Sequence, residues 1–148
     1  RPDMAPMIFT DAILKNLSID VFNFGKMKRD FTYIDDVVEV ICRCCKKPAT
    51  IDRQFNSEMP NSSSSFAPYR IFNVGCNNPV NLMDFIKLLE KNIGKKAKII
   101  LKPLQDGDVL ETEADIDLLN NWIGFRPETK IELGVKSFID WYKCYFKV

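Results

Sequence analysis

The sequence has no histidine and almost no net charge, because 21 Lys and Arg stand against 20 Asp and Glu in 148 residues. A zinc site would have to form without imidazole, from thiolates or carboxylates alone. A net charge of +1 provides no basic face for DNA or RNA. The chain has no apolar run of the roughly 18 residues that mark a membrane-spanning helix, and no signal peptide. We therefore expect no metal, nucleic acid or membrane as a ligand.

The cysteines are odd in number and do not form the two C-x-x-C pairs of a typical zinc site. They are Cys42, Cys44, Cys45, Cys76 and Cys144. On a helix, Cys42 and Cys45 can share the buried face, whereas Cys44 cannot. Reduced, packed thiols in a cytoplasmic protein are the expected state.

Apolar residues recur with helical spacing in some segments and as short β-prone runs in others, which indicates a mixed α/β class. With 46% apolar residues, the chain can bury a core of its own. The pattern predicts helices at residues 4–17, 34–47, 82–93, 117–123 and from 129 onward. It predicts short strands at 21–24, 29–31, 70–74, 97–101 and in the stretch leading to Ala114.

Local signals predict the ends of these helices. Asp35 and Asp36 stand where they can cap and charge-complement a helix that begins near Ile34. Asn81 and Gly94 are the expected cap and terminator of the 82–93 helix. Thr129 and Glu132 have the spacing of a capping box.

The same spacing predicts which side chains face inward. These are Ile8, Phe9, Ala12 and Ile13 in the first helix, Ile34, Val37, Val38, Ile41, Cys42 and Cys45 in the second, Leu82, Phe85, Ile86, Leu89 and Ile93 in the third, and Ile131, Val135, Phe138, Tyr142 and Tyr145 in the last. Residues 48–68, rich in proline and containing Asn61 followed by four serines, predict a long mobile loop.

Arg29 is the first candidate for binding a ligand. It ends a short extended run and precedes an acidic helix start, where a guanidinium can bind a phosphate through two parallel hydrogen bonds. The alternative is a surface arginine paired with a nearby carboxylate, which is common. Spacing alone does not decide between the two.

Asp108 and two phenylalanines are the next candidates. Asp108 follows Gly107 in a turn, where its carboxylate could reach ribose hydroxyls, although turn chemistry alone also favours this pair. Phe22 and Phe24, expected on a strand, could frame a base or offer backbone groups to its edge, or they could simply belong to the core.

In combination and in order, these segments resemble the UDP-glucuronate 4-epimerases, members of the extended short-chain dehydrogenase/reductase superfamily. The resemblance covers the whole chain and rests on Arg1-Pro2-Asp3-Met4, Gly25-Lys26-Met27-Lys28-Arg29-Asp30-Phe31-Thr32-Tyr33-Ile34-Asp35-Asp36, Ala67-Pro68-Tyr69-Arg70, Phe72-Asn73-Val74-Gly75, Leu82-Met83-Asp84-Phe85-Ile86 and Gly107-Asp108-Val109. It implies that residues 1–148 are the C-terminal, UDP-sugar-binding portion of an extended Rossmann-type nucleotide-sugar enzyme. The start at Arg1 leads us to expect that the polypeptide continues upstream.

The resemblance also implies roles for individual residues. Arg29 stands where such enzymes hold the UDP pyrophosphate, Asp108 where an acidic residue approaches the ribose, and Phe22 and Phe24 on the segment that reads the uracil edge. Arg1 falls near the sugar and its carboxylate. Gln105 replaces a second pyrophosphate-binding arginine found in many relatives.

The family oxidises C4 of the sugar with NAD, rotates the keto intermediate and returns the hydride, which interconverts UDP-glucuronate and UDP-galacturonate. That reaction requires a Gly-rich dinucleotide loop and a Tyr-x-x-x-Lys pair, and this sequence has neither. Catalytic and NAD-binding residues are therefore expected outside the chain, which alone should be inactive, within a cytoplasmic homodimer.

The alternatives within the superfamily are a UDP-N-acetylhexosamine 4-epimerase and a dTDP-glucose 4,6-dehydratase. From a different class, the alternative is a non-catalytic interaction module. The presence or absence of the Gly-rich loop and the Tyr-x-x-x-Lys pair in a longer polypeptide would separate this last reading from the enzymes.

Overall fold

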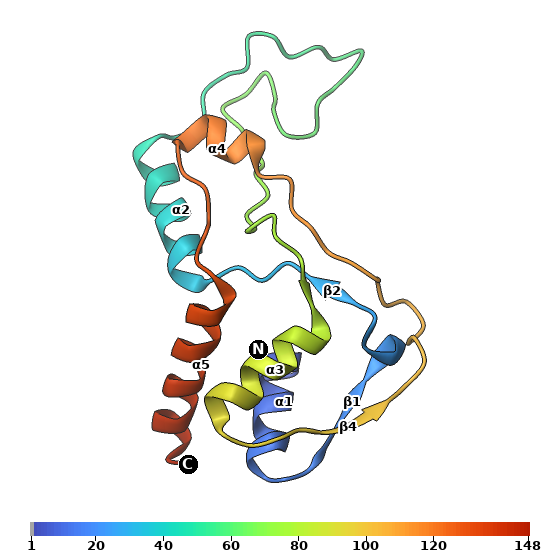
Figure 1. Cartoon of the computed structure of the whole chain (residues 1–148). Helices are drawn as coiled ribbons and strands as arrows, with labels where there is room; N and C mark the ends of the chain where they lie inside the picture. The colour runs from blue at the N-terminus through green and yellow to red at the C-terminus, as the bar shows by residue number, and fades with distance from the viewer. Residues whose placement is uncertain (1) are drawn as a thin grey trace. The chain divides into compact units, whose positions relative to one another are not determined.

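The computed structural model describes residues 2–148, and it confirms the mixed α/β class (Figure 1). Its elements are α1 (Ala5–Leu14), β1 (Ser18–Val21), the short 3-10 helix η1 (Phe22–Gly25), β2 (Lys28–Arg29), α2 (Ile34–Lys46), β3 (Val80–Asn81), α3 (Leu82–Ile93), β4 (Lys98–Leu101), α4 (Asp117–Ile123) and α5 (Ile131–Phe146). They fall into two compact units. The first unit runs up to Phe31 and includes Asn78–Thr112 and Lys130–Val148, and the second consists of Thr32–Asn77 and Glu113–Thr129.

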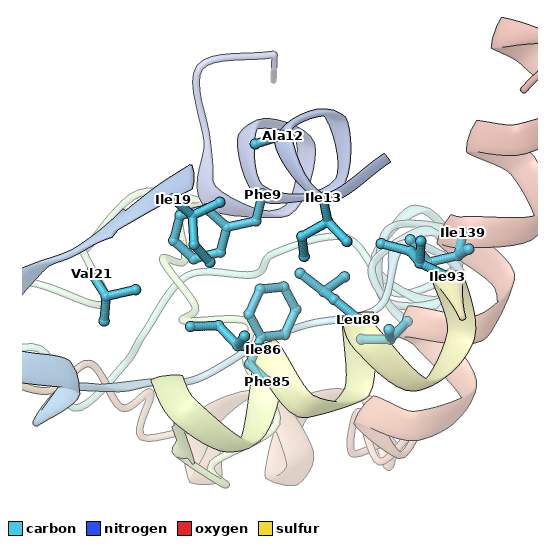
Figure 2. Close-up of a cluster of buried hydrophobic side chains, with 11 residues drawn as sticks. Phe9, Ala12, Ile13, Ile19, Val21, Phe85, Ile86, Leu89, Ile93 and Ile139 are labelled. Carbon is cyan, nitrogen blue, oxygen red and sulfur yellow. The ribbon is translucent and has the colours of Figure 1, made fainter. Parts of the chain in front are cut away.

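The core of the first unit lies between α1, α3 and α5, with β1 at its side (Figure 2). The spacing of three and four residues places one face of each helix inward. Phe31, just after β2, stacks on Phe85 with ring centroids 4.6 Å apart. The buried cluster comprises Phe9, Ala12, Ile13, Ile19, Val21, Phe85, Ile86, Leu89, Ile93, Val135 and Ile139.

Two of the predicted inward residues of this unit are exposed. Ile8 of α1 and Tyr145 of α5 both face solvent. In α1 the packed face is the one that carries Phe9, Ala12 and Ile13, and Ile8 lies beside it. Tyr145 instead stacks on Trp141, with ring centroids 5.3 Å apart.

The strand predicted at 21–24 lies earlier than expected, at Ser18–Val21. β1 ends at Val21 and pairs in parallel with β4, Ile19 opposite Ile99 and Val21 opposite Leu101. The backbone then turns, because Asn23 and Phe24 adopt left-handed φ angles of 47° and 51°. Phe22 and Phe24 therefore lie in η1, and their placement on a strand is wrong.

The prediction for α3 is confirmed at both ends. Asn81 occupies the N-cap position, although its side chain makes no capping hydrogen bond, and Gly94 ends the helix with a φ of 85°. Glu90, in the last turn, accepts hydrogen bonds from the backbone N–H of Ala97 (2.9 Å) and from Nζ of Lys96 (2.7 Å). Glu90 thereby fixes the turn that leads into β4.

In the second unit, α2 begins at Ile34 as predicted, but its cap differs from the expected one. Tyr33 is the N-cap residue and makes no side-chain capping bond, while Asp35 and Asp36 lie in the first turn. The carboxylate of Asp36 accepts hydrogen bonds from N–H (3.0 Å) and Oγ1 (2.9 Å) of Thr129. No capping box forms, because the N-cap position of α5 is taken by Lys130 and not by Thr129, and Lys130 makes no side-chain capping bond.

The predicted inner face of α2 is wrong. Ile34, Val38, Ile41, Cys42 and Cys45 are exposed, and Val40 is the buried residue of the helix. Arg43, on the packed side, donates to Glu39 (2.6 Å) and to the carbonyl of Gly124 (3.3 Å) and lies over the ring of Phe125. Within the second unit, α2 therefore packs through the side that carries Val40 and Arg43.

Two further predicted strands are absent from the described residues. Residues 70–74 carry only an isolated bridge between Ser64 and Arg70, and the stretch leading to Ala114 carries only a bridge between Lys28 and Glu111. A strand needs a ladder partner, and residues 2–148 supply none at 71–74.

Residues 48–68 form neither a helix nor a strand. Hydrogen-bonded turns hold them, with Asp52 N–H donating to the carbonyl of Ser65 and Phe55 packed edge-on against Phe66. The mobility of this loop stays a prediction. No helix within residues 2–148 is both long and apolar enough to cross a membrane.

The contribution of Glu90 to stability can be tested through the pH dependence of unfolding. The hydrogen bonds from Lys96 and Ala97 outweigh the effect of burial and hold the pKa of Glu90 below its ordinary value near 4.5. A carboxylate whose pKa is lower in the folded than in the unfolded state stabilises the folded protein at pH values above the unfolded pKa. This stabilisation is lost as the pH falls through the folded pKa. Glu90→Gln should therefore lower the free energy of unfolding by about 1–2 kcal/mol at pH 7, and the difference between the two proteins should shrink as the pH falls toward 3.

Urea unfolding at both pH values measures this difference. Lys96→Ala is the matched control, since the Lys96 side chain is 87% exposed and its share should stay below about 0.5 kcal/mol. A deficit of Glu90→Gln that persists unchanged at pH 3 would contradict the assignment.

Candidate functional site

The candidate site is built around β2, which lies between two neighbouring segments of the first unit. On one side β2 pairs antiparallel with β3, with Arg29 opposite Val80. On the other side, N–H of Lys28 donates to the carbonyl of Leu110 (2.9 Å), and N–H of Thr112 donates to the carbonyl of Lys28 (3.3 Å). These backbone bonds bring residues 108–112 alongside Arg29.

Arg29 is held by three acceptors. Its Nη2 donates to Oδ1 of Asp108 (2.8 Å), and its Nη1 donates to the carbonyls of Lys28 (2.8 Å) and Leu110 (3.3 Å). The side chains of Arg29 and Asp108 are 27% and 34% exposed, so the pair lies at the surface within reach of a ligand. The structure thus places together two candidate residues that are 79 positions apart in the sequence.

This ion pair is also what the simpler alternative for Arg29, a surface arginine paired with a carboxylate, predicts. The two readings are compatible, because the described contacts use three of the five N–H donors of a guanidinium. The remaining N–H donors can bind an incoming anion, while the three acceptors hold the plane of the guanidinium fixed.

Asp108 is positioned by a tight turn that also contains Gln105. N–H of Asp108 donates to the carbonyl of Gln105 (3.1 Å), and Gly107 has a φ of 80°, which a glycine adopts without strain. Oδ1 of Asp108 additionally accepts from N–H of Val109 (2.8 Å). Gln105 is exposed and belongs to the same turn as Asp108.

Phe22 and Phe24 lie in η1, between β1 and the segment that leads into β2. N–H of Phe24 donates to the carbonyl of Lys102 (3.0 Å), and Nδ2 of Asn23 donates to the carbonyl of Lys26 (2.7 Å). Phe24 is 55% exposed and Phe22 is half-buried. A left-handed φ is rare for a bulky side chain and is often associated with functional sites.

Sequence reasoning missed the left-handed pair and the carbonyl partners of Arg29. A signal for the pair was present, since Asn tolerates this conformation and Gly25 follows directly. The carbonyls of Lys28 and Leu110 left no signal, because backbone acceptors are not encoded by residue type.

A shallow pocket of about 450 Å³ opens beside β2. Lys26 and Lys28 line it together with Asp84 and Glu111, and Lys28 pairs with Glu111 at 3.3 Å. Arg29 and Asp108 are not among its lining residues. Arg1, the remaining candidate, lies outside the described residues, and within residues 2–148 no group of acidic or cysteine side chains could hold a metal ion.

Comparison with known proteins shows what this chain is similar to. Residues 3–75 match the model of the NAD dependent epimerase/dehydratase family. Over 99% of its length the chain is 49% identical to "Protein CapI" of Staphylococcus aureus, and over 96% it is 43% identical to "Probable UDP-glucuronate 4-epimerase" of Rhizobium meliloti. The chain is similar to both of these proteins over nearly its whole length.

The similarity covers only part of each relative. The chain spans 44% of the length of CapI and 42% of the Rhizobium protein. Against "UDP-glucuronate 4-epimerase 4" of Arabidopsis thaliana, at 38% identity, it spans 33%.

Solved structures agree on the fold. A UDP-glucuronic acid 4-epimerase from Bacillus cereus, in complex with UDP-glucuronic acid and NAD, matches 98% of this chain with a TM-score of 0.76 at 24% identity. MoeE5 with UDP-glucuronic acid and NAD matches with a TM-score of 0.77 at 21% identity. This chain covers 41% and 43% of those two structures.

The surface position of the ion pair gives a prediction about stability. Asp108→Asn removes a carboxylate whose side chain is one-third exposed, so the free energy of unfolding should fall by no more than about 1 kcal/mol. Urea unfolding measures this change. A loss above about 2 kcal/mol would assign the Arg29–Asp108 pair to structural support of β2 and not to a ligand site.

Proposed function

We propose that residues 1–148 are the C-terminal, UDP-sugar-binding portion of an NAD-dependent nucleotide-sugar epimerase that interconverts UDP-glucuronate and UDP-galacturonate. The observation that carries the proposal is the surface pair of Arg29 and Asp108, joined at 2.8 Å beside the turn that contains Gln105. The 43% identity to a probable UDP-glucuronate 4-epimerase supports the choice of reaction.

In this proposal Arg29 binds the diphosphate. A guanidinium is always charged and matches two phosphate oxygens at once. Asp108, Lys28 and Leu110 already orient the group through three hydrogen bonds. The ligand therefore meets a guanidinium that needs no reordering, which lowers the entropic cost of binding.

Asp108 and η1 hold the nucleoside in the same proposal. Oδ1 of Asp108 is engaged by Arg29 and by N–H of Val109, which leaves Oδ2 to accept a ribose hydroxyl. The half-exposed ring of Phe24 offers a face on which uracil can stack. Since N–H of Phe24 is bonded to Lys102, contacts to the base edge would use the carbonyls of η1.

Gln105 and Arg1 take the roles that the resemblance implies. Gln105 lies where many relatives have a second arginine, so that Arg29 provides most of the phosphate charge in this segment. Arg1 would lie near the carboxylate of the uronate.

The residues present do not fit NAD. Gly75-Cys76-Asn77 is not a Gly-rich dinucleotide loop, and the chain has no Tyr-x-x-x-Lys pair of the kind that the reaction requires. We therefore propose that the cofactor and the groups that move protons belong to another part of a longer polypeptide, which assembles as a homodimer.

The test of the binding role is Arg29→Ala in the longer polypeptide. A charge-assisted phosphate contact contributes about 1.5–3 kcal/mol, so the Kd for UDP should rise by about 10-fold or more, as measured by isothermal titration calorimetry. Arg126→Ala is the matched control, because Arg126 also pairs with an aspartate, Asp117, at 2.9 Å but lies in the other unit. If Arg29→Ala binds UDP as the unchanged protein does, Arg29 is not part of the site.

A second test uses the 148-residue chain alone. It should bind UDP weakly or not at all, because the cofactor side of the pocket is missing. Micromolar affinity in calorimetry would show instead that these residues form a complete nucleotide site.

The fold does not select the sugar. A dTDP-glucose 4,6-dehydratase from Bacillus anthracis matches 99% of the chain with a TM-score of 0.75 at 15% identity. Turnover of UDP-glucuronate, UDP-N-acetylglucosamine and dTDP-glucose by the longer polypeptide would separate the proposed reaction from its two alternatives.

A further inference from the structure

The turn that carries Asp108 contains the one Asp-Gly step of the chain. Asp106 is directly followed by Gly107, and no other aspartate or asparagine of the sequence precedes a glycine. The side-chain carboxyl group of an aspartate can be attacked by the backbone nitrogen of the next residue. A glycine leaves that nitrogen most accessible, because it has no side chain to crowd it. This step is therefore where the backbone is most prone to rearrange through its own side chain.

The structure leaves the Asp-Gly step open to this reaction. Asp106 and Gly107 are both exposed. Among the described residues, no atom beyond its chain neighbours lies within 4 Å of the position that a Cβ on Gly107 would take. Within residues 2–148, the carboxylate of Asp106 and the N–H of Gly107 have no hydrogen-bond or ion-pair partner. The carboxyl group can therefore rotate onto the nitrogen without breaking a bond first.

Two asparagines that precede serines are the next candidates by sequence, and both are restrained. Oδ1 of Asn56 accepts a hydrogen bond from N–H of Glu58 (2.9 Å). Oδ1 of Asn61 accepts from N–H (2.9 Å) and Oγ (2.7 Å) of Ser63. Ring closure at either asparagine would require these bonds to break. The structure as well as the sequence therefore selects Asp106.

We propose that Asp106 is converted to isoaspartate in the folded protein, and that this conversion separates Asp108 from Arg29. First, the nitrogen of Gly107 bonds to Cγ of the protonated Asp106 carboxyl group, whose hydroxyl leaves as water with the amide proton, and a succinimide ring forms. A water molecule then opens the ring at the main-chain carbonyl carbon of residue 106 and breaks its bond to the nitrogen of Gly107. The backbone now runs through Cβ and Cγ of residue 106, and the former main-chain carbonyl is a free carboxylate. Mass and net charge are unchanged.

The extra backbone atom lies inside the turn that positions Asp108. This turn is closed by the hydrogen bond from N–H of Asp108 to the carbonyl of Gln105, at 3.1 Å. The rearrangement lengthens the backbone between these two residues by one carbon–carbon bond, about 1.5 Å. The contact between Arg29 and Asp108 is 2.8 Å, and a hydrogen bond is lost beyond about 3.5 Å. A displacement by one bond length therefore takes Asp108 out of reach of Arg29.

The chemical step is independent of the proposed function, since it requires only the Asp-Gly step and water. Its effect on a ligand rests on the proposed function, which places the diphosphate and the ribose at Arg29 and Asp108.

Ageing of the longer polypeptide tests the chemical step. The protein is kept without nucleotide for several weeks at physiological temperature and neutral pH. Peptide mass spectrometry with electron-transfer fragmentation then distinguishes isoaspartate from aspartate at each position. Isoaspartate should be several-fold more abundant at residue 106 than at any other aspartate. Asp106→Glu is the matched control, because its longer side chain would have to close a larger ring, and it should form no isomer there. An even spread of isoaspartate over the aspartates would overturn the proposal.

Calorimetry with UDP tests the consequence for the site. Isomerised molecules should bind UDP at least about 10-fold more weakly. The fraction of binding sites lost during ageing, read from the titration stoichiometry, should therefore equal the fraction of isoaspartate at residue 106. Asp106→Glu, aged in the same way, should keep its sites. Full binding in a sample rich in this isomer would contradict the displacement of Asp108.

Repair of the aged protein provides an independent check. A protein-isoaspartate carboxyl methyltransferase transfers a methyl group from S-adenosylmethionine to the new carboxylate at residue 106. The nitrogen of Gly107 then displaces methanol, and hydrolysis of the re-formed succinimide restores part of the aspartate. UDP sites should return in proportion to the isoaspartate removed, and sites that stay lost would assign the loss to other damage. If the fresh protein does not bind UDP, the proposed function fails, whereas the isoaspartate content of residue 106 still decides the chemical step.

Discussion

The candidate site depends on the backbone pairing of Lys28. Its N–H and carbonyl bind Leu110 and Thr112 on one side of β2, while β3 pairs on the other. A two-residue strand is too short to be stable alone, so its position is set by these flanking segments. Their register determines that Asp108, and not a neighbouring residue, reaches Arg29. The site is therefore a product of long-range backbone pairing, although its chemistry belongs to two side chains.

The sequence predicted the elements of the first unit well. For α3, an apolar repeat, an N-terminal Asn81 and a C-terminal Gly94 all indicated the same helix, and the structure confirms its bounds. The prediction from sequence was wrong at η1, because the β-propensity of Val21 and Phe22 does not indicate the left-handed turn that follows. It also failed for Thr129, whose hydroxyl binds Asp36 of a distant segment instead of capping its own helix.

The second unit shows a different kind of failure. Periodicity identified the face of α2 that carries Ile34, Val38 and Ile41 as a core face and residues 70–74 as a buried strand. In this structure that face of α2 is exposed, and residues 71–74 form no strand. Apolar patterning indicates that a face tends to be buried, and it does not indicate which element covers that face. For the site, residue types suggested Arg29 and Asp108 as separate candidates. Their contact could not be predicted, because nothing in either local sequence specifies a partner 79 positions away.

The Arg29–Asp108 pair has a consequence for discrimination among anions. Without a ligand, the carboxylate of Asp108 neutralises the guanidinium at 2.8 Å, so the site presents little net positive potential to the surrounding solution. A small free anion such as inorganic phosphate gains little by approaching it. A molecule that carries both a diphosphate and vicinal hydroxyls can satisfy the cation and the carboxylate together. Under the proposed function, local neutrality favours a nucleotide sugar over inorganic phosphate.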